Sequence, residues 1–507
     1  MRYIIWIYMQ RHIKEEKRKM PSLIERINEL FPGTEASVMQ ESFAFQGGMQ
    51  AVCANIDGRE QLVVSGTGME MFRGRTVEIE KSEGETLRIC EMDHENCLSL
   101  KKCFSYTLPV AFGRECASIG CGDRLGLAGV GQLEAVKKTE IRPVMAQQSL
   151  RELTLTGRSY ENVMDAAAWA VFKTGYRSGY GADGDHLKTV EEVEQALAHG
   201  MSMITLDCSL ALCELPEGAL KRRELYERLP ESLRRDLEDE YLHDKDAEGL
   251  GLFFNQPLLE ETIVVYYDAV QLAEKVWELI QNVDYPVDLE ISLDETAHKT
   301  SLAAHYFVAR ELEKRKVILT SLAPRFVGEF QKAVDYIGDI NEFQMNLREH
   351  TKIADYFGYR ISVHSGSDKF RIFPAVEKET KKRFHLKTSG TSYLEALRVI
   401  ASEEPELYRK IHQAALKKFD EAKKYYEVHC VPSRVTVLSD VSDDKLSEYL
   451  EQDDARQLLH ITYGAILKDD QTLHEELYQA LHRHEEEYKK GVQLHFERHL
   501  RALGFIQ

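Results

Sequence analysis

The stretch YRISVHSG, residues 359–366, is a short apolar run that ends in polar and flexible residues, and it follows the amphipathic pattern of residues 342–358. Runs of this kind recur eight times between residues 117 and 390, and most are followed by a helical pattern. They cover residues 117–124, 142–149, 175–186, 201–209, 285–295, 316–325, 359–366 and 383–390. Eight strand-then-helix units predict an α/β fold, a (β/α)8 TIM-like barrel, whose catalytic groups lie at the C-terminal ends of buried parallel strands.

The sequence on either side of these eight runs shows other patterns of apolar and polar residues. Residues 20–115 contain alternating segments separated by turn signals and predict an N-terminal β-rich region. The barrel is predicted for residues 116–400, with a charged helical insertion at 210–284. Residues 401–507 predict a helical C-terminal tail with oppositely charged residues at i,i+4 spacing. Residues 1–19 are interpreted as an extension of doubtful value to the fold.

Composition narrows the class of protein. A chain of 507 residues with 43% hydrophobic residues is long enough for more than one core. A formal net charge of −19 argues against a nucleic-acid or anionic-membrane partner, although a few arginines in a cleft still permit a small anionic substrate. Nine cysteines without a CxxC pair indicate reduced thiols and a cytoplasmic protein, and no segment is apolar enough to span a membrane. The sequence leaves open whether the protein is a homo-oligomer.

The ends of three predicted strands carry residue types used in catalysis and metal binding. Asp185 and His186 end the third run and offer a base beside a metal ligand, or else a turn that caps the next helix. Asp294 and Glu295 end the fifth run, where two carboxylates must pair, bind metal, face water or cap a helix. His364 ends the seventh run and is either a metal ligand or a histidine that caps the strand.

The remaining strand ends point to binding of an anion or a sugar. His385 and Lys387 lie two residues apart and therefore on one face of the eighth strand, and the turn after it opens a helix that favours anions. The other ends contribute Asp123, Arg124, Gln148, Asp207 and Arg325. The chain has no P-loop, no dinucleotide-binding GxGxxG and no GxSxG motif, which discounts an NTPase, an NAD-dependent enzyme and an α/β-hydrolase.

Six segments in this order carry a family resemblance: IGCGDRLGLA, GADGDHLKT, ISLDET, ILTSLAPRFVGEFQKAVDYIGD, HSGSDKF and LKTSGTSYLEALR. With them the chain resembles the tagaturonate/fructuronate epimerase family of bacterial hexuronate catabolism, over about residues 115–400. The resemblance implies a metal-dependent isomerase that interconverts D-tagaturonate and D-fructuronate, and some relatives also act on tagatose and fructose. It implies a ketohexuronate as the substrate and a divalent ion, Zn, Mn or Ni, as the cofactor.

The resemblance also implies roles for particular residues. Asp185 is the expected proton acceptor, with Glu295 as a second catalytic residue. The metal ligands implied are His186, Glu295 and His364, and the strand-end position of His385 makes it a further candidate ligand. The residues expected to bind the substrate are Asp123, Arg124, Gln148, Asp207, Arg325, Ser365 and Lys387, of which Arg124, Arg325 or Lys387 would hold its carboxylate. This chain has Ala304 before His305 where a Glu-His pair is expected, so no role is assigned to His305.

The chemistry of the two sugar acids favours a retro-aldol route. They differ at C3, counted from the carboxylate, while the ketone is at C5, so simple enolisation cannot invert C3. Deprotonation of the C3 hydroxyl breaks the C3–C4 bond, the aldehyde rotates, and the bond forms again on its other face. A transient hydride shift is the chemical alternative. The alternative functions are another metal-dependent barrel enzyme on sugars, either a ketose isomerase or an aldolase, and a non-catalytic sugar-binding barrel.

Overall fold

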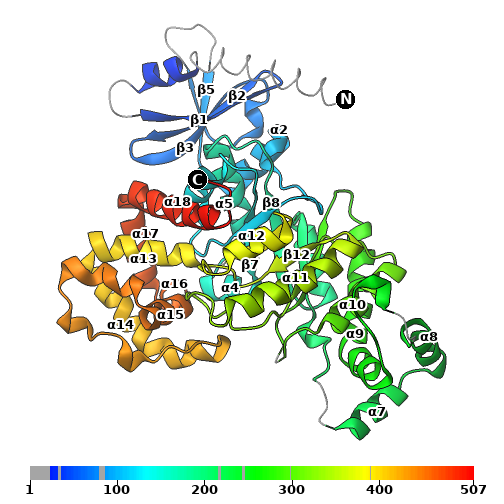
Figure 1. The fold of residues 1–507 in the computed structure, drawn as a ribbon. Helices are drawn as coiled ribbons and strands as arrows, with labels where there is room; N and C mark the ends of the chain where they lie inside the picture. Colours follow the sequence, from blue (N-terminus) through cyan, green and yellow to red (C-terminus); the bar gives the residue numbers. More distant parts are fainter. Residues whose placement is uncertain are drawn as a thin grey trace. The chain divides into compact units, whose positions relative to one another are not determined.

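The computed structural model describes residues 23–31, 36–78, 86–214, 218–242, 246–296, 298–388 and 390–507 (Figure 1). The extension interpreted at 1–19 lies outside these residues. By their internal contacts, the residues form two compact units. The first comprises the chain up to Pro109 together with Glu161–Tyr180, and the second comprises Val110–Tyr160 and Gly181–Gln507. The sequence analysis instead ended the N-terminal region at residue 115 and placed 161–180 in the barrel.

The first unit contains a five-stranded antiparallel sheet, which confirms the predicted β-rich region. Its strands, in the spatial order β1-β2-β3-β5-β4, are β1 (Ala36–Gln46), β2 (Met49–Ile56), β3 (Arg59–Gly66), β5 (Thr86–Cys90) and β4 (Arg75–Glu78). Two-residue turns at 47–48 and 57–58 join the first three strands. All four turn residues have positive φ, as the tight turns of twisted hairpins require, which explains the glycines and the Asp-Gly pair there.

Each face of this sheet carries its own apolar cluster because side chains alternate along a strand. Val64 lies on the face that packs against Trp169 and Phe172 of α5 (Tyr160–Lys173), and α2 (His94–Cys103) contributes to the same cluster. The neighbouring Val63 lies on the opposite face with Leu23, which belongs to a helix at residues 23–30. The sheet is thus covered by helices on both faces, and α5 belongs to this unit although it follows a barrel strand in sequence.

The second unit contains a closed barrel of eight parallel strands, and all eight predicted runs supply one strand each. In chain order the strands are β6 (Ser118–Cys121), β7 (Arg142–Ser149), β8 (Gly181–Leu187), β9 (Met203–Asp207), β10 (Asp288–Leu293), β11 (Ser321–Pro324), β12 (Arg360–Val363) and β13 (Phe384–Thr388). β13 pairs with β6 in parallel and closes the barrel. Each strand pairs with its neighbours in chain order, so the C-terminal ends of all eight meet at one rim.

Helices follow the strands as the sequence pattern predicts. They are α3 (Gly129–Val136), α4 (Leu150–Thr156), α6 (Val190–Ala198), α9 (Gln256–Gln281), α10 (Leu302–Lys314), α11 (Ile340–Phe357), α12 (Phe373–Thr380) and α13 (Thr391–Glu403). Within the segment 210–284, α9 packs against α6 and α10 and so occupies the place of the barrel helix after β9. Only α7 (Ala219–Glu227) and α8 (Glu231–Tyr241) are extra α-helices in that segment among the residues described.

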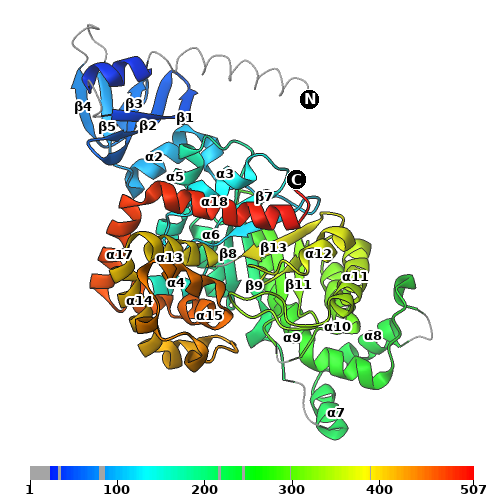
Figure 2. The same cartoon turned by 60° about the vertical axis from the view of Figure 1, so that its left-hand side comes forward.

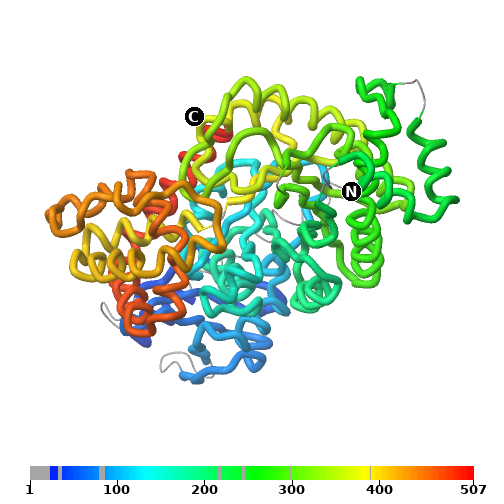
Figure 3. The backbone as a smooth tube through the Cα atoms, turned by 90° about the horizontal axis from the view of Figure 1, so that it is seen from below, coloured from blue at the N-terminus to red at the C-terminus, as the bar shows by residue number. Residues whose placement is uncertain are grey.

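The C-terminal region packs on the barrel and is part of the second unit. Its α-helices are α14 (Pro405–Ala422), α15 (Asp453–Ile461), α16 (Tyr463–Leu467), α17 (Gln471–Arg483) and α18 (Glu485–Ala502). The last helix, α18, packs against α3 and α13 (Figure 2). Figure 3 shows this region and the α7–α8 pair on opposite sides of the barrel. No helix in the described ranges is long and apolar enough to cross a membrane.

Candidate active site

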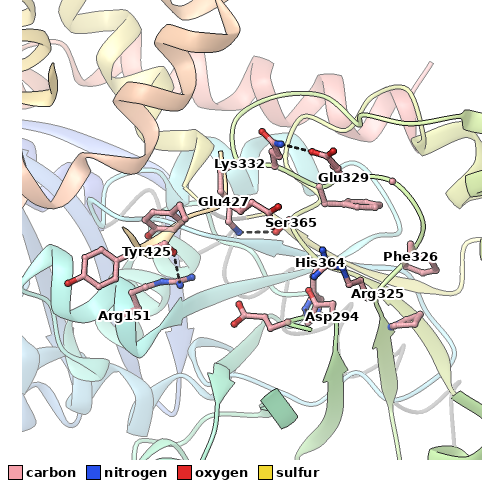
Figure 4. Close-up of a pocket in the computed structure, with 16 residues that line it drawn as sticks. Arg151, Asp294, Arg325, Phe326, Glu329, Lys332, His364, Ser365, Tyr425 and Glu427 are labelled. Carbon is pink, nitrogen blue, oxygen red and sulfur yellow. Dashed lines mark hydrogen bonds and ion pairs between the residues drawn. The ribbon is translucent and has the colours of Figure 1, made fainter. Parts of the chain in front are cut away.

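A cavity of about 310 Å³ lies at the C-terminal rim of the barrel (Figure 4). Its walls come from the segments that follow β10, β11 and β12, including Asp294, Arg325 and His364. The segment Tyr425–Glu427, after α14, supplies another part of the wall. A second cavity of about 40 Å³ shares six lining residues with the first and also reaches Asp185, His186 and Lys387. Several of the predicted strand-end residues and part of the C-terminal region therefore line one connected site.

A buried lysine organises the floor of this site. Lys387 Nζ lies 2.5 Å from Asp185 Oδ1, 2.9 Å from Asp183 Oδ2 and 3.4 Å from Glu290 Oε1. It also donates to the Thr205 hydroxyl. Burial opposes ionisation of Asp185, but the Lys387 ammonium outweighs it and lowers the pKa of this carboxyl to about 2. Burial raises the pKa of Asp183, which Lys387 only partly offsets. Asp185 is therefore the carboxylate of this cluster that is held ionised at the cavity.

His364 is held between two carboxylates. Its Nε2 lies 2.7 Å from Glu290 Oε1, and its Nδ1 lies 3.0 Å from Asp294 Oδ1. Burial disfavours the charged ring, but Asp294 and Glu290 prevail and raise the pKa of His364 to about 10. The capping interpretation of Asp294 is wrong, because the hydroxyl of Ser301 caps α10 and Asp294 turns toward His364.

His186 is strained and incompletely bonded. Its φ of 54° lies in the left-handed region that costs a non-glycine residue about 1–3 kcal/mol. Its Nδ1 lies 3.6 Å from Asp207 Oδ2 and 4.0 Å from Glu295 Oε1 and forms no hydrogen bond within the described chain. The ring meets that of His364 edge-on, with centroids 5.0 Å apart. The ligand atoms of His186, Asp207 and Glu295 all lie within 4.8 Å of one another, a spacing that suits a metal ion.

Two of the residues expected to bind substrate have structural partners. The carboxylate of Asp123 accepts hydrogen bonds from three main-chain N–H groups in residues 125–128 and so shapes the turn after β6. Arg124 is buried, donates to Glu152 Oε1 at 3.0 Å and lies over the Tyr463 ring at 3.7 Å from its centroid. Arg124 lines the smaller cavity, but its charge is already paired.

Other predicted residues are divided between the cavity and the barrel interior. His385 is fully buried, and its Nδ1 forms a hydrogen bond with the Ser118 hydroxyl at 2.7 Å. Burial lowers the pKa of His385 to about 3, and the ring is not among the residues that line either cavity. Gln148 accepts from Arg158 Nη1 at 3.0 Å and lies outside both cavities as well. Arg325 lines the larger cavity.

The sequence reasoning missed Asp183, Glu290, Arg151 and Lys332. Glu290 lies in the middle of β10, and Asp183 lies in β8 two residues before Asp185, so neither is the last polar residue of its run. Their signal was a charged side chain inside a run that is otherwise buried, since such a group needs a partner. Arg151 belongs to the first turn of α4, and Lys332 belongs to the loop after β11. Neither position carries a sequence signal that distinguishes it from a surface cation.

A second group of potential metal ligands lies outside the residues that line the two cavities. It consists of Asp368, His495 and His499. Asp368 follows His364 in the same loop, and Arg456 Nη2 donates to its Oδ2 at 2.5 Å. The main-chain N–H of Asp368 donates to His499 Nε2 at 3.0 Å, so this imidazole nitrogen already has a partner. His495 Nε2 lies 3.3 Å from Asp368 Oδ1. The cluster therefore ties the loop that carries His364 to helix α18.

Low pH is expected to reduce the contribution of the Asp368–His495–His499 cluster to the free energy of unfolding. Burial, against the attraction of Asp368, lowers the pKa of His495 to about 3. The unfolded chain binds a proton on this histidine below about pH 6.5, whereas the folded chain does not, so the free energy of unfolding falls as pH drops through this window. We expect His495→Gln to remove up to about 1.4 kcal/mol per pH unit from the slope measured by urea unfolding between pH 7 and pH 4. Identical slopes for the two proteins would contradict this assignment.

The barrel, the cavity at its C-terminal rim and the buried acid–base groups define an enzyme of the (β/α)8-barrel class. A family model described as tagaturonate epimerase matches residues 39–503. The chain therefore belongs to the tagaturonate epimerase family, and the resemblance carried by the six motifs is confirmed. This makes it an enzyme of the carbohydrate epimerase type.

Individual relatives agree along almost the whole chain. A tagaturonate/fructuronate epimerase of Thermotoga maritima is 39% identical over 449 residues, which is 87% of this chain and 92% of that protein. The native crystal structure of the fructuronate-tagaturonate epimerase from Cohnella laeviribosi superposes with a TM-score of 0.90 at 42% identity, and its complex with one glycerol does so with 0.89 at 43%. Both alignments cover 96% of this chain and 99% of the other.

Proposed function

We propose that this protein interconverts D-tagaturonate and D-fructuronate at the connected cavities of the barrel rim. The observation that carries the proposal is Asp185, an ionised carboxylate locked to Lys387 and facing the smaller cavity beside His186. An epimerase needs a base at the hydroxyl of the reacting carbon and a space that retains both fragments of a cleaved sugar. The family to which the chain belongs supplies the substrate class.

The site residues also fit a divalent metal ion. His186 Nδ1 and Asp207 Oδ2 are buried, lie 3.6 Å apart and have no hydrogen bond in the described chain, and the nearest cation to this oxygen is Lys188 Nζ at 3.2 Å. With Glu295 they form a set of one imidazole and two carboxylates, which suits Zn, Mn or Ni. We propose that these three residues hold the ion, with His364 beside them. When bound, the ion supplies a Lewis acid that polarises the ketone and a neighbouring hydroxyl.

Asp185 is proposed to accept the proton of the C3 hydroxyl. As the hydroxyl loses this proton, C3 becomes an aldehyde carbon, the C3–C4 bond breaks, and its electron pair forms the C4–C5 enediolate. After the aldehyde turns its other face, the enediolate carbon attacks it, and Asp185 returns the proton to the C3 oxygen. Lys387 lowers the pKa of Asp185 and so keeps this group unprotonated before each turnover. The cycle consumes no co-reactant, and all atoms of the substrate are recovered.

The walls of the cavity are proposed to keep the two three-carbon fragments together. Tyr425 and Glu427 line it from the C-terminal region, and Phe326 lines it from the segment after β11. In Figure 4, Arg151 and Tyr425 lie on one side of the view and Arg325 and Phe326 on the other. An aldolase uses the same bond cleavage but releases its fragments, so retention distinguishes the two functions.

Removal of metal is expected to lower activity at least about 10²-fold, because a Lewis acid supplies several kcal/mol of transition-state stabilisation. The measurement is epimerase activity and metal content after treatment with EDTA, followed by addition of Mn²⁺, Zn²⁺ or Ni²⁺. Asp207→Asn is expected to bind less metal than wild type, whereas the matched control Asp123→Asn, which alters a turn outside the proposed ligand set, is expected to retain it. Full activity of the metal-free protein would overturn the proposed role of the ion.

A further inference from the structure

Two cationic side chains line both cavities and have no carboxylate partner among the described residues: Arg151 and Lys332. Arg151 Nη1 donates only to the main-chain oxygen of Tyr425, at 3.3 Å, and its guanidinium lies 4.8 Å from the centroid of the Tyr426 ring. Lys332 Nζ donates to the hydroxyl of Ser365 at 2.9 Å. The hydrogen bonds of Arg151 and Lys332 and the ring contact of Arg151 are thus all made to neutral groups.

Three neighbouring cations are paired with carboxylates, whereas Arg325, which lines only the larger cavity, has no carboxylate partner among the described residues. Arg124 is bonded to Glu152 at 3.0 Å, Lys387 to Asp185 at 2.5 Å, and Lys188 Nζ lies 3.2 Å from Asp207 Oδ2. The chain has 84 acidic and 65 basic residues, so a shortage of carboxylates does not explain two unpaired cations in one cavity. The arrangement instead leaves local positive charge that an anion from outside the protein can neutralise.

The electrostatic surroundings of Lys332 also favour the binding of an anion. Burial lowers the pKa of this lysine, and the nearby Arg151 guanidinium lowers it further, while the Glu152 and Glu295 carboxylates offset only part of this decrease. An anion placed between the two cations removes their mutual repulsion and restores the charged form of the amine. A guanidinium and an ammonium together suit a carboxylate, since arginine binds its two oxygens in a fork and lysine adds a point charge.

Both side chains are carried by segments that other contacts hold in place. Arg151 lies in the first turn of α4, which the hydroxyl of Ser149 caps. The loop that carries Lys332 is fixed by Lys369, whose buried ammonium donates to the main-chain oxygens of Gln331 at 2.8 Å and Val334 at 2.6 Å. Preorganised cations bind an anion with less loss of side-chain entropy than mobile ones do.

We propose that Arg151 and Lys332 bind the carboxylate of the ketohexuronate and thereby select sugar acids over neutral ketoses. The inference rests on the proposed function and deepens it. Only two carbon–carbon bonds separate the carboxylate of the substrate from C3, so its binding site must lie beside the base. The smaller cavity meets this condition, because Arg151, Lys332 and Asp185 all line it. Of the residues expected from sequence to hold this carboxylate, Arg124 and Lys387 are already ion-paired, and Arg325 lines only the larger cavity.

The test compares wild type, Arg151→Met, Lys332→Met and Arg325→Met with D-tagaturonate and with neutral D-tagatose, each followed by NMR at enzyme concentrations that detect slow conversion. The matched control is Lys424→Met, which removes an exposed cation close in sequence to the Tyr425–Glu427 wall. We expect KM for tagaturonate to rise at least about 30-fold in the variants at 151 and 332, as loss of a charged hydrogen bond of about 2 kcal/mol implies. The ratio of kcat/KM for tagaturonate to that for tagatose should fall in parallel, and Lys424→Met should match wild type.

Two results would overturn this carboxylate site. One is a KM for tagaturonate that stays within about threefold of wild type in both variants, where the charge-assisted contact predicts a rise of at least about 30-fold. The other is a loss confined to Arg325→Met, which would move the carboxylate to the larger cavity. A failure of the proposed function is distinguishable, because wild type itself would then leave tagaturonate unchanged. Circular dichroism of the four variants separates loss of binding from loss of fold.

Discussion

Asp185→Asn is expected to lower kcat for the interconversion of tagaturonate and fructuronate by about 10²–10⁴-fold, the usual contribution of a positioned general base. The asparagine oxygen can still accept the hydrogen bond from Lys387 Nζ, which lies 2.5 Å from Asp185 Oδ1 in the wild type, so the floor of the cavity keeps its shape. KM should change much less than kcat, since the variant loses proton transfer and keeps the binding groups.

The measurement is a full kinetic profile of the variant with tagaturonate, together with its urea unfolding curve. Asp123→Asn is the matched control, because it makes the same chemical change at a carboxylate whose partners are main-chain N–H groups of a turn. A kcat for Asp185→Asn within about fivefold of wild type would contradict the role of Asp185, since a general base contributes at least about 10²-fold.

Lys387→Met has the largest expected effect on stability. It leaves Asp183, Asp185 and Glu290 together without the ammonium that now lies within 3.4 Å of each. Breaking a buried ion pair by removing one partner costs about 3–5 kcal/mol, and here one cation serves three carboxylates. We therefore expect a decrease of at least this size in the free energy of unfolding, measured with urea at pH 8. Lys410→Met, which removes the cation of the exposed Lys410–Glu476 pair, should change it by less than about 1 kcal/mol.

The pH dependence of this variant should also change sign. In wild type, Lys387 outweighs burial and lowers the pKa of Asp185 and Glu290, so their contribution to stability is lost as pH falls through those pKa values. Without the lysine, burial raises the pKa of Asp183 and Asp185, while the His364 ring still lowers that of Glu290, so protonation of the two aspartates then favours the folded chain. The free energy of unfolding of Lys387→Met, taken relative to that of wild type at each pH, should therefore rise from pH 8 to pH 5. A decrease over this range would contradict the charge assignment.

The barrel was predictable because its signal repeats. Each of the eight strands is a short apolar run with a polar end. Parallel strands that are buried on both faces typically have such apolar runs. The ends of the runs also identified Asp185, His186, Glu295 and His364, which the structure brings to one site. The local sequence was enough to predict these four residues, because each lies at the end of an apolar run.

The missing parts of the site depend on contacts that no local pattern encodes. Glu290 points into the barrel from mid-strand, and Lys332 lines the cavity from a loop that hydrogen bonds of Lys369 hold. The wall at Tyr425–Glu427 comes from a region whose charged helices were interpreted as a tail. For His385 the strand position suggested a metal ligand, whereas its Nδ1 pairs with the Ser118 hydroxyl inside the barrel. The place of each of these four features depends on the direction of its side chain and on packing between residues that are far apart in the sequence.

The most direct test of the central claim is a ¹H NMR time course of D-tagaturonate with the metal-loaded enzyme in D₂O. The account predicts signals of D-fructuronate at the expense of tagaturonate, a constant total of the two, and retention of the C3 proton, because the retro-aldol route breaks a carbon–carbon bond and leaves the C3–H bond intact. Unchanged tagaturonate or the build-up of three-carbon fragments would contradict the proposed epimerase. Deuterium at C3 of the product would contradict the proposed role of Asp185 at the hydroxyl.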